Sequence, residues 1–252
     1  MRRGLRFSEF RGPAIASVVY LALAAMPGLW FAVLHALYPN ETRVLYPDAT
    51  MLQMIGQHLA LVGLSSLIST VVGVGLGVFV TRPAGRDFFG VVTDLSNLGQ
   101  TFPPVAVFTL AVPLLGFGFE PTVLALTIYG VLPILHNTIA GLQSLPDSML
   151  ESARATGMPP AEVLRRIELP LASPVILAGI RISVVVNVAT ATIGAVANAG
   201  GLGTPIINGL VNLDPAITLQ GALLAAGLAL ILDAYLGAFE RAAARRTNSA
   251  RY

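Results

Sequence analysis

The sequence predicts an all-α integral membrane protein with about six transmembrane helices. Of its 252 residues, 55% are apolar and only 11% are charged, and the mean hydropathy is +0.76. A soluble domain carries about 25% charged residues, so this chain has too few ions to cover an aqueous surface. In lipid, only helices and closed barrels satisfy every backbone group. The apolar and polar residues do not alternate as they would along barrel strands, which favours helices.

Six segments with few or no charged residues account for the predicted spans. Crossing a hydrocarbon core of about 30 Å takes about 20 apolar residues in a helix. We therefore predict the spans Pro13–Leu37, Leu52–Val80, Val91–Leu115, Thr122–Leu145, Leu171–Val196 and Ile217–Phe239. The first is too long for a signal-peptide core, so we expect a retained helix. Pro103 and Pro104 should kink or interrupt the third span.

Arginine supplies all the basic charge, since the sequence contains no lysine. Thirteen of the fifteen arginines fall on one side of the predicted spans, in the tails 1–12 and 240–252 and in the loops 81–90 and 146–170. Positive residues favour the cytoplasmic side. We therefore expect a multi-pass protein of a bacterial cytoplasmic (inner) membrane, with one membrane domain over residues 1–252 and with both termini and the loop 146–170 in the cytoplasm. The pI of about 9.3 then reflects orientation in the lipid bilayer and no binding of nucleic acid.

The loop 146–170 is charged, amphipathic and bracketed by prolines. We expect a short helix that ends near Gly157, because glycine permits a sharp bend. A second helix should begin at Pro159 and Pro160 and end before Pro170. Its charged residues, Glu168 among them, should face water or a partner. Both a solvated helical hairpin and an element that docks into a groove on another protein fit this pattern.

The same loop carries a motif. Glu151-Ser152-Ala153 is followed after three residues by Gly157, and nine residues later by Ile167-Glu168-Leu169-Pro170. This spacing resembles the EAA motif of type I ABC importer permeases, with serine at 152 where alanine is usual. The resemblance implies a permease fold whose loop forms coupling helices seated in a cleft of an ATP-binding cassette ATPase subunit. It assigns that contact to Glu151, Ser152, Ala153, Gly157, Ile167, Leu169 and Pro170.

Later segments resemble one branch of these permeases. They are Ala178–Arg181, Thr190–Gly194 and the glycine-rich turn Ala199–Gly203. They are similar to the importers of glycine betaine, carnitine and choline, so the resemblance implies an osmoprotectant permease with an extracytoplasmic substrate-binding protein and a second permease chain, identical or paralogous. A permease for another small solute, such as an amino acid or a sulfonate, is an alternative. A stand-alone channel or secondary transporter is another.

The chain is not expected to be an enzyme. A phosphate-binding loop of the type GxxxxGK[ST] needs a lysine, and the sequence has none. ATP and magnesium would therefore bind to a partner ATPase, and no cofactor or metal is expected in this chain.

Polar residues recur at helical spacing in two of the predicted spans. We predict that Tyr129 and Asn137 in the fourth span, and Asn187, Thr190, Gly194 and Asn198 in and just after the fifth, line a translocation path. Hydrogen bonding between packed helices is the alternative. These stripes hold no aromatic cluster that could bind a quaternary ammonium group through cation–π attraction. High-affinity recognition is therefore expected in the separate binding protein.

Two features concern helix packing. Gly73 and Gly77 form a pair of small residues suited to close contact with a neighbouring helix, in this chain or another. Arg181 lies inside the fifth span. We expect its side chain to extend toward the cytoplasmic interface rather than to form an ion pair, for which Asp233 is the candidate partner.

Overall fold

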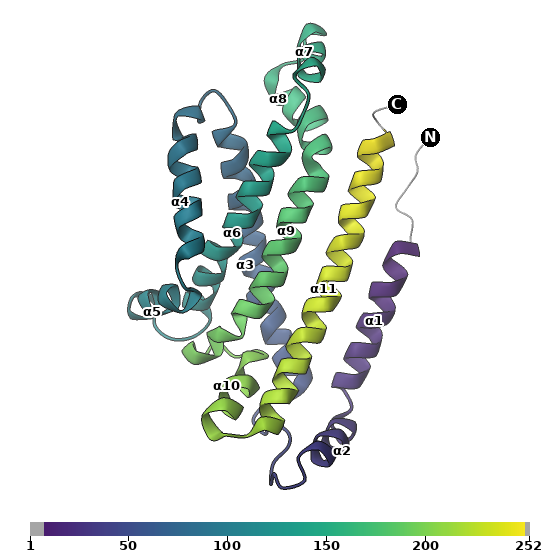
Figure 1. The fold of residues 1–252 in the computed structure, drawn as a ribbon, viewed down its shortest axis with the longest axis vertical. Coiled ribbons are helices and arrows are strands. Elements are labelled where there is room, and N and C mark those ends of the chain that lie inside the picture. The colour runs from purple at the N-terminus through teal and green to yellow at the C-terminus, as the bar shows by residue number, and fades with distance from the viewer. Residues whose placement is uncertain (1–7, 250–252) are drawn as a thin grey trace.

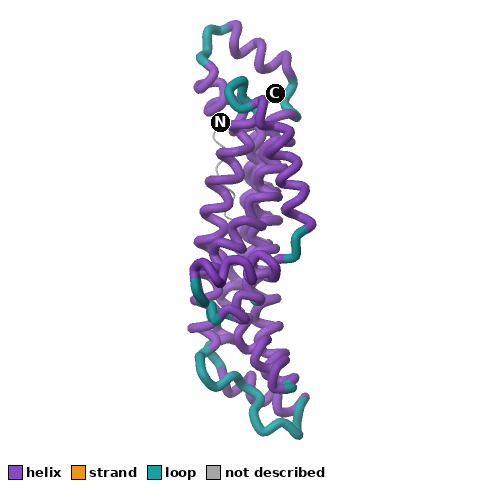
Figure 2. The backbone as a smooth tube through the Cα atoms, turned by 90° about the vertical axis from the view of Figure 1, so that its left-hand side faces the viewer, coloured by secondary structure: helices purple, strands orange, loops and turns teal. Residues whose placement is uncertain are grey.

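The computed structural model describes residues 8–249, and Arg2, Arg3, Arg6 and Arg251 of the predicted tails lie outside the described residues. Every regular element in this part of the chain is helical. The α-helices are α1 (Ser8–Ala24), α2 (Pro27–Leu37), α3 (Met51–Val80), α4 (Phe89–Thr101), α5 (Pro104–Leu115), α6 (Phe119–Gln143), α7 (Asp147–Ala155), α8 (Pro160–Val163), α9 (Leu169–Ala191), α10 (Gly203–Asn212) and α11 (Pro215–Ser249). Figure 2 shows a slender bundle with loops at its two ends.

The number of spans agrees with the prediction when each bent helix pair is counted as one. Four continuous helices in the described residues are long and apolar enough to cross a membrane: Met51–Val80, Phe119–Gln143, Pro160–Ala191 and Pro215–Thr247. Two further pairs, α1 with α2 and α4 with α5, pass the same test together but bend by 76° and 100°. The protein is therefore an all-helical membrane protein with four to six spans.

Proline explains both bends. The second bend falls at Phe102 and Pro103, as Pro103 and Pro104 predicted. The prediction of an unbroken first helix is wrong, because the chain leaves the helical conformation at Met26, directly before Pro27. A residue that precedes proline is disfavoured in the helical region, whereas proline itself suits the first turn of the next helix.

The second helix of the loop 146–170 does not end before Pro170, which corrects another prediction. Pro160–Ala191 forms one continuous helix with a π-helical turn, η2, at Leu164–Glu168. The Leu169 N–H bonds to the carbonyl of Leu164, five residues back. Such a local change in helical hydrogen bonding lets a helix accommodate a proline, which has no N–H to donate. The last helix, α11, also continues ten residues beyond the predicted end at Phe239.

Helix α6 packs between α3 and α9, and α11 packs against α9. Close contact of α3 with α6 depends on glycine: a Cβ at Gly73 would lie 2.9 Å from the Ile134 side chain, and one at Gly77 would lie 2.7 Å from Thr138. The neighbour of this glycine pair therefore belongs to the same chain.

Figure 1 shows that α7 and α8 lie at the same end of the bundle as the start of α1, the connection from α3 to α4 and the end of α11. We call this the arginine-rich end, because these segments carry most of the arginines. The opposite end holds α2 and α10, and the connection from α2 to α3 contains Arg43.

Candidate functional site

The helical hairpin of α7 and α8 projects from the arginine-rich end. Gly157 forms its bend with a φ of +84°, a left-handed conformation that costs a residue with a Cβ free energy. A Cβ at Gly157 would meet nothing of this chain within 4 Å. Glycine is therefore needed here for the backbone conformation and not for lack of space.

The motif residues differ in exposure. Glu151, Ser152, Gly157 and Pro170 are exposed, Ile167 and Leu169 are half-buried, and Ala153 is buried. The Ser152 hydroxyl donates to the backbone carbonyl of Ser148 at 2.7 Å. Serine in place of the usual alanine therefore has its proton satisfied inside α7. Glu151 and Ser152 in α7 and Gly157 just after it are thus exposed on the hairpin, where a partner can reach them.

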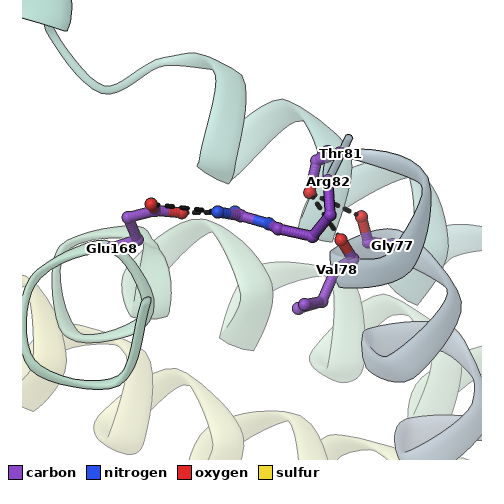
Figure 3. A network of polar contacts seen from close by, with 5 residues as sticks. All are labelled: Gly77, Val78, Thr81, Arg82 and Glu168. Carbon is purple, nitrogen blue, oxygen red and sulfur yellow. Dashed lines mark hydrogen bonds and ion pairs between the residues drawn. The ribbon is translucent and has the colours of Figure 1, made fainter. Parts of the chain in front are cut away.

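Glu168 departs from its expected place, because it does not face water or a partner. Its side chain is buried and forms an ion pair with Arg82 from the connection between α3 and α4. Arg82 Nη1 donates to Glu168 Oε1 at 3.0 Å, and Nη2 donates to Oε2. Figure 3 shows the Arg82 side chain extending from the end of α3 to Glu168.

A buried polar layer lies where α3, α6 and α9 meet. Asn187 is fully buried, and its Nδ2 donates to the hydroxyl oxygens of Ser66 at 3.2 Å and Ser65 at 3.4 Å. The Ser183 hydroxyl donates to the Gly130 carbonyl at 2.8 Å. Thr190 is also buried. These contacts join helices within one chain, which is the arrangement that the packing alternative describes.

The other predicted path residues are distributed over different elements. Tyr129 OH donates to the Phe102 carbonyl and so ties α6 to the bend between α4 and α5. Asn137 Nδ2 donates to the Pro133 carbonyl within α6 at 2.9 Å. Gly194 is buried against Thr122, whereas Asn198 is exposed with a φ of +61°. The structure therefore buries both Asn187 and Thr190, one turn apart in α9, but it distributes the six residues over several elements.

Residues 69–245 match the model of a protein family described as binding-protein-dependent transport system inner membrane component. The chain belongs to this family of permeases. Such a permease is a multi-pass protein of an inner membrane and one component of an ABC transporter, in which a separate ATPase subunit binds ATP and a binding protein delivers the solute. The permease itself carries no cofactor.

Several relatives resemble this permease over most of its length. The osmoprotectant import permease protein OsmY of Salmonella typhimurium is 38% identical over 226 residues, which cover 89% of this chain and 92% of the relative. The choline transport system permease protein OpuBB of Bacillus subtilis is 38% identical and matches 73% of this chain and 84% of its own. The glycine betaine/carnitine/choline transport system permease protein OpuCB of the same organism is 38% identical, and the match covers 76% of this chain and 87% of the relative.

Solved structures show the same fold at lower identity. A chain of the MetNI methionine ABC transporter, in an inward-facing conformation, superposes with a TM-score of 0.68 and 22% identity over 76% of this permease and 95% of that chain. A chain of a bacterial alginate ABC transporter superposes with a TM-score of 0.66 and 16% identity, over 97% of this permease and 99% of that chain. The predicted fold of an ABC importer permease is confirmed.

Two residues that hold the glycine-rich turn of the permease were not predicted from the sequence. His58 Nδ1 accepts the Leu202 N–H at 3.3 Å, while its Nε2 lies 3.0 Å from the Val188 carbonyl, to which it donates. Gln57 Oε1 accepts the Gly201 N–H at 2.9 Å. The available signal was a pair of adjacent polar residues near the start of an otherwise apolar span.

Arg181 forms an ion pair with Asp233, so the expectation that its side chain extends toward the membrane interface instead is wrong. Its Nε and Nη2 donate to Asp233 at 2.7 and 2.8 Å, and Nη1 donates to Glu240 at 3.1 Å. Glu240 reaches Arg181 because α11 continues beyond Phe239. The three charged residues line a groove of about 410 Å³ between α9 and α11.

Proposed function

We propose that this permease imports quaternary-amine osmoprotectants of the class of glycine betaine, choline and carnitine. The observation that carries the proposal is the identity of 38% to several permeases whose names give these solutes. The motifs Ala178–Arg181, Thr190–Gly194 and Ala199–Gly203 support the same branch. The likeness to transporters of methionine and alginate is weaker in sequence, 22% and 16% identity, and indicates the fold alone.

The exposed hairpin of α7 and α8 would contact the ATPase subunit through Glu151, Ser152 and Gly157, while Ala153, Ile167, Leu169 and Pro170 hold its shape. A second permease chain, identical or paralogous, would complete the translocation path. ATP binding and hydrolysis can change the permease only if the ATPase contacts this hairpin differently in the two states, because a ligand shifts an equilibrium only through a difference in affinity.

For orientation, we propose that residues 1–252 form one membrane domain with both termini and the loop 146–170 in the cytoplasm. The support is the clustering of arginine-bearing segments at one end of the bundle, because positive residues are retained on the cytoplasmic side. An ATPase that binds ATP in the cytoplasm would then meet the hairpin.

The transport activity is tested in proteoliposomes that contain this chain, a candidate second permease chain, the ATPase and the binding protein. We expect uptake of labelled glycine betaine that requires ATP and is reduced by unlabelled choline or carnitine. ATP hydrolysis that depends on this chain, without uptake of any of the three solutes, would contradict the proposed substrate class and retain the permease function. Uptake without ATP would favour a stand-alone transporter.

The path prediction for Asn187 and Thr190 requires that the transport cycle open their contacts, because both are buried within the chain. The protein contains no cysteine, so single cysteines can be introduced without background. If the prediction holds, Asn187→Cys reacts with a membrane-impermeant thiol reagent in at least one of the apo, ATP-bound and vanadate-trapped states, and glycine betaine slows the reaction. The exposed Asn198→Cys serves as the positive control. Absence of reaction at residue 187 in all three states would assign it to helix packing.

A further inference from the structure

The ion pair of Arg82 and Glu168 joins two segments that are 86 residues apart in the sequence. Only 4% of the Glu168 side chain is exposed, against 27% of Arg82. A guanidinium that donates two bonds to one carboxylate holds it in direction as well as in distance. Because Glu168 is buried, water competes little for this contact, which makes it a firm link between the connection after α3 and the helix that follows the hairpin.

On one side the link is fixed to the end of α3, which packs closely against α6. Arg82 lies two residues after Val80, the last residue of α3, and its N–H bonds to the Phe79 carbonyl at 3.0 Å. The Thr81 hydroxyl donates to the carbonyls of Val78 at 2.8 Å and Gly77 at 3.1 Å, which closes the end of the helix. One residue of that last turn, Gly77, is the point at which α3 contacts Thr138 of α6. A displacement of Arg82 would therefore move α3 and α6 together.

On the other side the link is fixed to the hairpin. Glu168 is the last residue of the π-helical turn that lies between α8 and α9, in one continuous helix over Pro160–Ala191. A movement of the hairpin thus reaches α9 directly through this helix. Helix α6 also runs into the hairpin through residues 144–146 and packs against α9. Helix α3 has no chain connection to the hairpin, so the ion pair gives its end a polar link to the helix that follows the hairpin. The link lies in a π-helical turn, and such turns are frequent at functional sites.

We propose that Arg82 and Glu168 are positioning residues that make the end of α3 follow α9 when the ATPase moves the hairpin. The proposal rests on the proposed contact between the hairpin and the ATPase. Without the ion pair, the end of α3 moves against the start of α9, and the cycle of the ATPase is then poorly converted into opening of the path.

The test separates this role from a structural one by removing both charges. Each single variant, Arg82→Gln or Glu168→Gln, leaves one charge without its partner and can disturb folding. The double variant Arg82→Gln/Glu168→Gln leaves no unpaired charge, so its amount in the membrane should recover. In the double variant, the number of solute molecules imported per ATP hydrolysed should stay below the wild-type number. We expect a reduction of roughly 5- to 150-fold, the usual range of coupling between sites. The control is Glu9→Gln/Arg245→Gln, which removes an ion pair between α1 and α11 outside the hairpin, and it should keep the wild-type ratio.

A second measurement does not depend on the identity of the solute. Spin labels at Gly75→Cys on α3, where a side chain has open space, and at the exposed Arg165→Cys in the π-helical turn report the distance between the two segments. In the complex with the ATPase we expect ATP to leave this distance unchanged in the otherwise wild-type chain and to change it in the double variant. The proposal would be overturned if ATP affected this distance equally in the otherwise wild-type chain and in the double variant. It would also be overturned if the double variant imported as much solute per ATP as the wild type. Failure of the wild-type chain to import glycine betaine would bear on the substrate class alone.

Discussion

Replacing Gly157 with valine is expected to abolish ATP-dependent uptake while the protein stays in the membrane in normal amount. The residue has a φ of +84°, and a side chain with a Cβ in this region costs about 1–2 kcal/mol, more for a β-branched residue. A cost of this size changes the population of the bent hairpin by a factor of about 5–30. Because the hairpin is the proposed contact with the ATPase, the bend matters for coupling and not for the packing of the spans.

The matched control is Gly157→Asn, because asparagine tolerates the left-handed conformation better than other residues with a Cβ. It should retain far more uptake than Gly157→Val, since a side chain at this position meets nothing of this chain within 4 Å. Uptake, the amount of protein in the membrane and co-purification with the ATPase are measured for both variants. Equal loss in the two variants would assign the defect to the added side chain at the interface. Normal uptake by the valine variant would remove the bend from the coupling mechanism.

Replacing Gly77 with leucine should have the largest effect on stability. A Cβ at this position would lie 2.7 Å from both Cβ and Cγ2 of Thr138, so α3 and α6 must separate. Overpacking of this kind costs about 1–3 kcal/mol, and sometimes more. At roughly 2–4 °C for each kcal/mol in a chain of this size, the thermal midpoint of the detergent-solubilised protein should fall by several degrees.

Gly75→Leu is the control for Gly77→Leu. It lies two residues away on the same helix, is exposed, and a Cβ there meets nothing within 4 Å. Because leucine favours a helix more than glycine does, Gly75→Leu should leave the thermal midpoint unchanged or raise it slightly. A similar fall in both variants would show that the contact between α3 and α6 is not what limits stability.

The periodicity of polar residues in a span predicts which of them share a helical face, but not what that face contacts. Ser183, Asn187 and Thr190 share a helical face in the sequence, as they do in α9, but the spacing does not say what that face meets. In the structure it meets α3 and α6, and Asn187 bonds to Ser65 and Ser66. Whether a polar face borders a path or another helix is decided by neighbours that lie 53 to 122 residues away in the sequence.

The partners of two charged residues, Glu168 and Arg181, also depend on the tertiary structure. Glu168 and Arg181 were expected to face water, a partner or the membrane surface, which is the lowest-energy choice for an isolated helix. Each instead has a partner of opposite charge on another element, Arg82 for Glu168 and both Asp233 and Glu240 for Arg181. These partners are separated by 86, 52 and 59 residues in the sequence, so no local sequence pattern predicts the contacts.

By itself, the sequence determined the membrane fold, the number of spans, the family and the bend at Gly157. These depend on properties that single segments carry: apolar length relative to the lipid bilayer, the placement of arginine, a motif with fixed spacing, and the conformational freedom of glycine. The break at Pro27 was equally local and could have been predicted from the proline. The tertiary structure alone decided the link between Arg82 and Glu168, the partners of Arg181 and the burial of Asn187. Each of these depends on which helix faces come together, and that is set by the packing of the whole bundle.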